Sequence, residues 1–140
     1  ALGFDVRAAL ARSLIVSADM AHAAHPNYPE KHEDCMRPRL HSGTVIKYNA
    51  SQRYATSART AATIKSIAAA ANLPVQEFEV RNDSPCGSTI GPMMAAGSGA
   101  ETVDIGLPQL SMHSIREMCS AADVGHGVGL MAAIYSKYAY

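Results

Sequence analysis

Hydrophobic residues recur along this 140-residue chain with two periods, one typical of helices and one typical of strands. Apolar positions three or four residues apart predict helices over residues 1–13, 53–71 and 123–138. Short apolar or alternating runs predict strands at residues 14–16, 44–48, 75–80 and 103–105. This alternation of helices with strands favours an α/β fold, in which a layered sheet carries helices on both faces.

Polar and helix-breaking residues set the expected ends of these elements. The first strand leads into Asp19, which is therefore expected at the carboxyl end of a buried strand. Tyr54 is expected at the start of the long helix. Gly106 and Pro108 are expected to end the last strand, because glycine and proline commonly interrupt regular structure.

The last predicted helix contains three glycines, each of which costs about 1 kcal/mol relative to alanine. Tertiary packing must therefore hold this helix. Its helical spacing predicts one apolar stripe of five residues, Val124, Val128, Met131, Tyr135 and Tyr138. A capping box at residues 114–117 would instead start a helix directly after His113.

Two segments have the composition of loops. Residues 25–39 are rich in proline and charge. Residues 81–92 contain several turn-forming residues and precede a short helical stretch through Met93 and Met94. The second loop could cradle an anion with its backbone N–H groups, or it could simply be a tight strand-to-helix connection. Its Cys86 has no base partner in the local sequence, which favours an inert thiol.

Charge and cysteine content narrow the class of protein. Twelve basic residues balance 12 acidic ones, which removes the electrostatic reason to expect a nucleic acid or an anionic membrane as a partner. No stretch approaches the length of a membrane span, and the charged start predicts no signal peptide. The three cysteines form no CxxC pair, so we expect free thiols in a soluble, cytoplasmic protein.

The residues with chemical potential are histidines, one aspartate and one lysine. Asp19, His22 and His25 follow the first strand, where α/β sheets place their ligands, and could form a metal or substrate site or merely cap turns. His113 lies in a similar polar turn. Lys47 interrupts a β-forming run, where a lysine usually faces solvent, but in a cleft it would attract an acidic substrate group.

Four long motifs resemble the aspartyl aminopeptidases of the M18 metallopeptidase family. They are SADMAHAAHPNYPEKHE, RPRLHSGTVIKYNASQRYATSA, VRNDSPCGSTIGP and PQLSMHSIREMCS. They occur in order from about residue 13 onward, and residues 1–140 resemble the C-terminal portion of the catalytic domain. The resemblance implies an α/β scaffold of the dinuclear-zinc aminopeptidase type, incomplete within this chain.

The same resemblance implies roles for five residues. Asp19 of SADMAH and His113 of LSMHSIRE are expected to bind two different zinc ions. His22, Lys47 and Tyr54, together with Asp19, are expected to contact the substrate. A metal-activated water is the nucleophile in this family, and its glutamate base and remaining metal ligands lie upstream of these motifs. No catalytic base is therefore expected within this chain.

The resemblance also predicts substrates, assembly and one local structure. Peptides with an N-terminal Asp or Glu are the expected substrates, with Lys47 facing the acidic side chain. Family members form large closed homo-oligomers, commonly dodecamers. Residues 114–119 are expected to run extended, with the last helix beginning near Asp123.

Two other functions fit part of the same sequence. The vacuolar branch of the family prefers neutral N-terminal residues, but it lacks the lysine found here in VIKYN. A non-catalytic fragment or assembly module would explain why the upstream ligand motifs are absent from the chain. Zinc content and the response to a chelator would distinguish this module from an enzyme.

Overall fold

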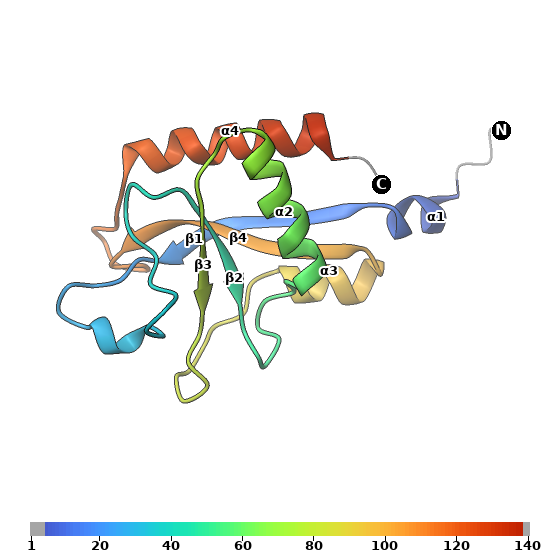
Figure 1. The fold of residues 1–140 in the computed structure, drawn as a ribbon. Helices are drawn as coiled ribbons and strands as arrows, with labels where there is room; N and C mark the ends of the chain where they lie inside the picture. Colours follow the sequence, from blue (N-terminus) through green and yellow to red (C-terminus); the bar gives the residue numbers. More distant parts are fainter. Residues whose placement is uncertain (1–4, 139–140) are drawn as a thin grey trace.

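The computed structural model describes residues 5–138, which form a single mixed sheet with helices against it (Figure 1). Its strands are β1 (Leu14–His22), β2 (Thr44–Tyr48), β3 (Val75–Glu79), β4 (Glu101–Leu110) and β5 (Met118–Cys119). The order across the sheet is β1-β4-β2-β3, with the short β5 paired to the end of β4. β1 runs parallel to β4, and β2 runs parallel to β3 but antiparallel to β4.

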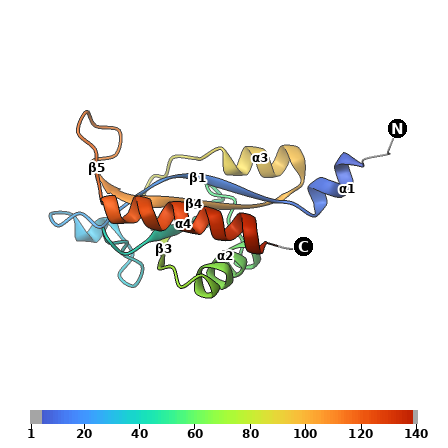
Figure 2. The same cartoon turned by 90° about the horizontal axis from the view of Figure 1, so that it is seen from above.

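Helices cover both faces of this sheet, as predicted. α2 (Ala58–Ala70) and α4 (Ala121–Lys137) pack on one face, and α3 (Gly91–Ser98) lies on the other (Figure 2). The short helix α1 (Val6–Ala11) precedes β1, and the 3-10 turn η1 (Pro29–Lys31) lies in the loop that follows β1. None of the helices within residues 5–138 combines the length and apolarity that crossing a bilayer requires.

Alternation along β2 gives each face of the sheet its own core. Ile46 is fully buried against α2 and α4, where it packs in a cluster with Ile64 and Leu130. Its neighbour Val45 faces the opposite side and packs with Phe78. Because successive strand residues point to opposite faces, Lys47 shares the face of Val45 rather than that of Ile46. The predicted strand at 44–48 is thus confirmed, and its lysine lies on the same face of the sheet as α3.

Two predicted strand ends are wrong. β1 continues to His22, so Asp19 lies inside the strand rather than at its end. β4 continues through Gly106 and Pro108 to Leu110. The reason is pairing: all nine residues of β1 are in register with β4, and this ladder outweighs the local preference of glycine and proline for turns.

The second helix begins later than predicted. Ser57 caps α2, its hydroxyl accepting a hydrogen bond from the Thr60 amide while the Thr60 hydroxyl accepts one from the Ser57 amide. This reciprocal cap fixes the start of the helix at Ala58 and leaves Tyr54 in the preceding loop. In the first predicted helix, α1 covers only Val6–Ala11, and residues 1–4 lie outside the described part of the chain.

Of the five residues in the apolar stripe predicted for the last helix, only Met131 and Tyr138 pack against the core. Val124, Val128 and Tyr135 are exposed, whereas Asp123, Leu130 and other residues face the sheet. Buried Asp123 explains this orientation, because its carboxylate accepts hydrogen bonds from the backbone N–H groups of His41 at 2.7 Å and Gly43 at 2.8 Å. These hydrogen bonds tie the start of α4 to the loop before β2.

The segment before α4 contains turns and then β5, with no helix at residues 114–117. Ser120 caps α4 through the amides of Ala122 and Asp123. The prediction that the last helix begins near Asp123 is therefore confirmed, and the capping box at 114–117 is not used. Residues 114–119 are extended only in part, at β5.

At Gly106, β4 packs tightly against the backbone of β1. A Cβ atom at this position would lie 2.6 Å from the carbonyl carbon of Met20 and 2.7 Å from its oxygen. Because these are backbone atoms of β1, they cannot move aside as a flexible side chain could. The absence of a side chain at Gly106 therefore keeps Met20 and Asp19 close to the centre of the sheet.

We expect Gly106→Ala to destabilise the full-length protein by about 1–3 kcal/mol, because the added methyl group forces the two strands apart. Urea unfolding measures this change. Gly125→Ala is the matched control: nothing lies within 4 Å of its Cβ position, and alanine favours the helix there. Equal stability of the two variants would contradict the close packing inferred at Gly106.

Candidate metal and substrate site

Asp19 of β1 and Lys47 of β2 form an ion pair across β4, the strand between them. The Lys47 side chain is only 3% exposed, whereas that of Asp19 is 50% exposed. The lysine ammonium donates to the Asp19 carboxylate and to the Met20 carbonyl, 3.2 Å away. Gly106 of β4 lies between the two strands, opposite Asp19 on β1 and opposite Val45 on β2. Because it has no side chain, it leaves room for the contact between Lys47 and Asp19. The sequence alone could not decide whether Lys47 faces solvent, and the structure shows that it is buried.

Tyr54 lies on the other side of the Lys47 ammonium, which is 5.0 Å from the centroid of its ring. This is the geometry of a cation–π contact. Burial, a hydrogen bond from Cys86, and the negative charges of Asp19 and Asp104 raise the pKa of Tyr54 above its usual value. The phenol therefore stays protonated at neutral pH and can donate a hydrogen bond to an oxyanion.

The loop that carries Tyr54 is held by Asp104 of β4. Asp104 is fully buried, and its carboxylate accepts a hydrogen bond from the Ala55 amide at 2.6 Å. The backbone N–H of Asp104 donates to the Thr56 hydroxyl at 2.9 Å. The sequence did not identify Asp104 as important. Its only local signal is a charge inside an apolar strand, and its partners lie 48 and 49 residues away in the chain.

The loop at residues 81–92, one possible anion cradle, leads into the start of α3. There the Asp104 carboxylate lies against Gly91, where a Cβ atom would be 2.3 Å from one of its oxygens. The loop thus makes the predicted connection from a strand, β3, to a helix, α3. Cys86 donates to the Tyr54 hydroxyl at 3.5 Å and to the Gly87 carbonyl at 3.1 Å, so neither contact supplies a base.

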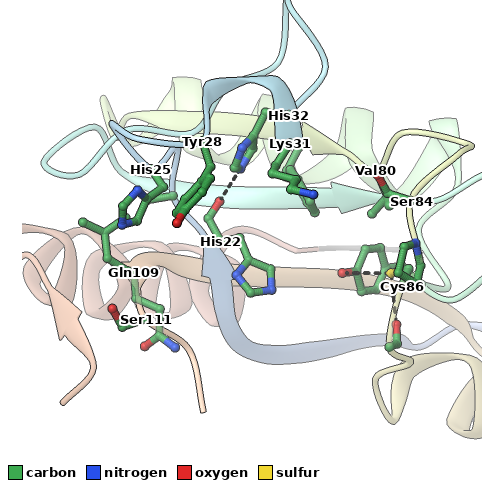
Figure 3. Close-up of a pocket in the computed structure, with 16 residues that line it drawn as sticks. His22, His25, Tyr28, Lys31, His32, Val80, Ser84, Cys86, Gln109 and Ser111 are labelled. Atoms are coloured by element: carbon green, nitrogen blue, oxygen red, sulfur yellow. Dashed lines mark hydrogen bonds between the residues drawn. The ribbon is translucent and has the colours of Figure 1, made fainter. Parts of the chain in front are cut away.

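A cavity of about 490 Å³ lies beyond the end of β1. Figure 3 shows the side chain of His22 near its middle, with Tyr28 and His32 on one side and Cys86 at the far end. The His22 carbonyl lies 3.3 Å from Nε2 of buried His32, which holds the loop after β1 against the strand. Among the described residues that line the cavity there are three histidines and one lysine but no aspartate or glutamate. The cavity thus suits a neutral or anionic ligand.

The imidazole of His22 is electrostatically linked to the other candidate residues. Burial, followed by the charges of His32, His113 and Lys47, lowers the pKa of His22 below 6.5. His22 is therefore neutral at pH 7, with one ring nitrogen free to accept a hydrogen bond and the other able to donate. The positive charges of His113 and Lys47 thus both act on His22.

This lowered pKa predicts a loss of stability in mild acid. Below pH 6.5 the unfolded chain binds a proton at His22 that the folded chain resists, so the free energy of unfolding falls as the pH falls through this range. We expect His22→Gln to make the unfolding midpoint in urea less dependent on pH between 7.5 and 5. His126→Gln should retain the part of this dependence that comes from His22. An unchanged slope in His22→Gln would contradict the prediction.

His113 lies in the turn between β4 and β5, with a left-handed backbone at φ 69°. Its backbone N–H donates to the Glu117 carboxylate, and its exposed imidazole ring forms no hydrogen bond within residues 5–138. An imidazole and the half-exposed Asp19 carboxylate are ordinary zinc ligands, so both fit the metal role. Within residues 5–138, however, no three His, Cys, Asp or Glu side chains gather as a metal site would require. Any complete zinc site must draw further ligands from elsewhere.

Comparison with known proteins assigns the family. The family described as aminopeptidase I zinc metalloprotease (M18) matches residues 3–135. The chain therefore belongs to the M18 family of zinc metallopeptidases. It is 56% identical over 135 residues to the probable aspartyl aminopeptidase of Ricinus communis and 54% identical over 129 residues to the aspartyl aminopeptidase of Dictyostelium discoideum. These matches cover 96% and 92% of this chain but only 28% and 27% of the relatives, so the chain spans less than a third of their length.

Solved structures share the fold. A chain in the cryo-EM structure of the Ape4 and Nbr1 complex superposes with a TM-score of 0.92 at 49% identity, covering 96% of this chain and 26% of that one. A chain of the S. cerevisiae mApe1 dodecamer gives a TM-score of 0.86 at 33% identity, covering 95% and 29%. The predicted α/β fold with helices on both faces, and its incompleteness relative to these proteins, are thus confirmed.

Proposed function

We propose that this chain is the C-terminal portion of the catalytic domain of a zinc-dependent aminopeptidase that releases N-terminal Asp or Glu from peptides. The observation that carries the proposal is the buried Lys47 ammonium, which lies between the Asp19 carboxylate and the Tyr54 ring. A buried cation next to a potential metal ligand is a natural receptor for an acidic side chain on the residue being cleaved. The names of the relatives, aspartyl aminopeptidase, agree with this substrate class.

Each of the five residues has a role that its surroundings support. Asp19 and His113 would each hold a zinc ion, and Asp19 would also contact the substrate. Lys47 would attract the substrate's acidic group in a site that is partly shielded from water. Neutral His22 and protonated Tyr54 can both donate hydrogen bonds to the substrate or to an oxyanion formed from it.

The proposal includes parts that lie outside this chain. Two zinc ions per complete active site would supply the activated water that attacks the peptide carbonyl. The glutamate base and the remaining metal ligands would come from another part of the full-length protein. We further propose a homo-oligomer, a dodecamer like that of the mApe1 structure, and a cytoplasmic location. All three cysteines are free thiols, which is typical of reducing compartments.

A comparison of two chromogenic substrates tests the proposal. The full-length protein is expected to hydrolyse an Asp-linked substrate much faster than a Leu-linked one, and a chelator should abolish the activity. A preference for Leu would identify the neutral-residue type of the family. A pure protein that contains no zinc and cleaves neither substrate would favour a non-catalytic assembly module, which the lack of a three-ligand site within residues 5–138 makes the second candidate.

A further inference from the structure

The charge of Lys47 is already neutralised inside the protein. Its ammonium donates hydrogen bonds to the Asp19 carboxylate and to the Met20 carbonyl, and it lies over the ring of Tyr54. The second carboxylate on this side of the sheet, Asp104, accepts a hydrogen bond from the Ala55 amide and forms no ion pair with Lys47. Asp19 is therefore the partner that balances the buried lysine.

This pairing conflicts with a simple receptor role for Lys47. A buried lysine that already pairs with one carboxylate is stabilised little by a second carboxylate, because the first already compensates its charge. A substrate carboxylate would also be repelled by Asp19, whose side chain is half exposed on the same side. Recognition of an acidic residue at Lys47 thus requires that Asp19 give up part of its negative charge to something else.

We propose that Asp19 is an internal counter-ion that occupies Lys47 in the metal-free protein and releases it on ligating zinc, so that binding of acidic residues depends on the metal. The inference rests on the proposed function and adds a regulatory coupling to the same site. Zinc and the Lys47 ammonium compete for one carboxylate. Because such coupling is reciprocal, the metal strengthens the binding of an acidic ligand by the same factor as the ligand strengthens the binding of the metal.

Binding of L-aspartate and L-asparagine to the full-length protein measures this coupling without catalysis. The two ligands have nearly the same shape and differ in one charge. In the wild-type protein, we expect the preference for aspartate over asparagine to rise about tenfold or more between the metal-free and the zinc-loaded form, measured by calorimetry. In Lys47→Met this rise should be lost. A rise that persists in Lys47→Met would mean that the zinc charge alone attracts aspartate, and it would overturn the proposal.

Two further measurements test the counter-ion directly. In the metal-free protein, Asp19→Asn removes the negative charge that balances Lys47, so this variant should prefer aspartate more strongly than metal-free wild type does. Lys47→Met removes the cation that competes with zinc, so we expect it to bind zinc about tenfold more tightly in a chelator competition. The control Lys65→Met removes another ion-paired lysine, one that pairs with Glu77 on the edge strand β3, and should leave zinc affinity unchanged.

These experiments separate the coupling from the proposed activity. If the wild-type protein cleaves Asp-linked substrates but Lys47→Met binds zinc no more tightly than wild type, the counter-ion inference is wrong and the aminopeptidase proposal stands. If no peptide is cleaved, the aminopeptidase proposal fails, while the zinc and aspartate affinities still report on the coupling. Circular dichroism of each variant establishes that it is folded.

Discussion

Asp19→Asn in the full-length protein is expected to lower kcat/KM for an Asp-linked substrate by about 1,000-fold or more, equivalent to about 4 kcal/mol of transition-state stabilisation. Asparagine preserves the shape of the side chain and can still accept a hydrogen bond from Lys47. It loses the negative charge that makes a carboxylate a strong zinc ligand. Zinc content, measured by atomic emission on the purified variant, should fall together with the activity.

Asp34→Asn is the matched control for this variant. Asp34 is also a carboxylate paired with a basic residue, Arg37, but it lies on the surface with its side chain largely exposed. Its replacement should leave both zinc content and kcat/KM within about twofold of wild type, because exposed ion pairs contribute little. Full zinc content in Asp19→Asn would show that Asp19 is not a ligand.

Lys47→Met is expected to remove most of the preference for acidic N-terminal residues. We expect kcat/KM for an Asp-linked substrate to fall about 100-fold and that for a Leu-linked substrate to change by less than about threefold, a difference near 2 kcal/mol. Methionine fills a similar volume in the buried space beside Tyr54, so the variant isolates the loss of charge. Steady-state kinetics with both substrates measures the change in selectivity.

Zinc content accompanies this measurement, because Lys47 contacts a proposed ligand. The variant should keep its zinc, which separates a loss of substrate recognition from a loss of metal. Lys65→Met should behave as wild type with both substrates. Lys65 lies on α2 and pairs with Glu77, on the face of the sheet opposite to that of Lys47. Equal losses on the acidic and the neutral substrate would contradict a charge-recognition role for Lys47.

The local sequence determined most elements of the fold. The β-branched run at 44–48 forms β2 with the predicted bounds, because β-branched residues favour strands. The long helix after Ser57 and the final helix also follow from their apolar spacing. The predictions failed where local and long-range preferences disagreed. Gly106 and Pro108 remain inside β4 because the residues on either side of them are paired with β1 along the whole strand.

The sequence motifs identified five candidate site residues, but spacing alone could not bring them together. Lys47 contacts Asp19, 28 residues earlier in the chain, because β4 inserts between β1 and β2 and presents Gly106 at the crossing point. Likewise, Tyr54 faces Lys47 because Asp104 holds its loop through the Ala55 amide. Strand order and register are long-range properties that no local pattern encodes.

The sequence by itself thus determined which side chains this M18 chain offers for chemistry and on which kinds of element they lie. Only the tertiary structure decided that Lys47 is buried, that its charge is balanced by Asp19, and that the buried face of α4 is the one with Asp123. The physical reason is common to all three. Burial of a charge is tolerated only where a partner is present, and here each partner comes from a distant segment that the sheet brings into contact.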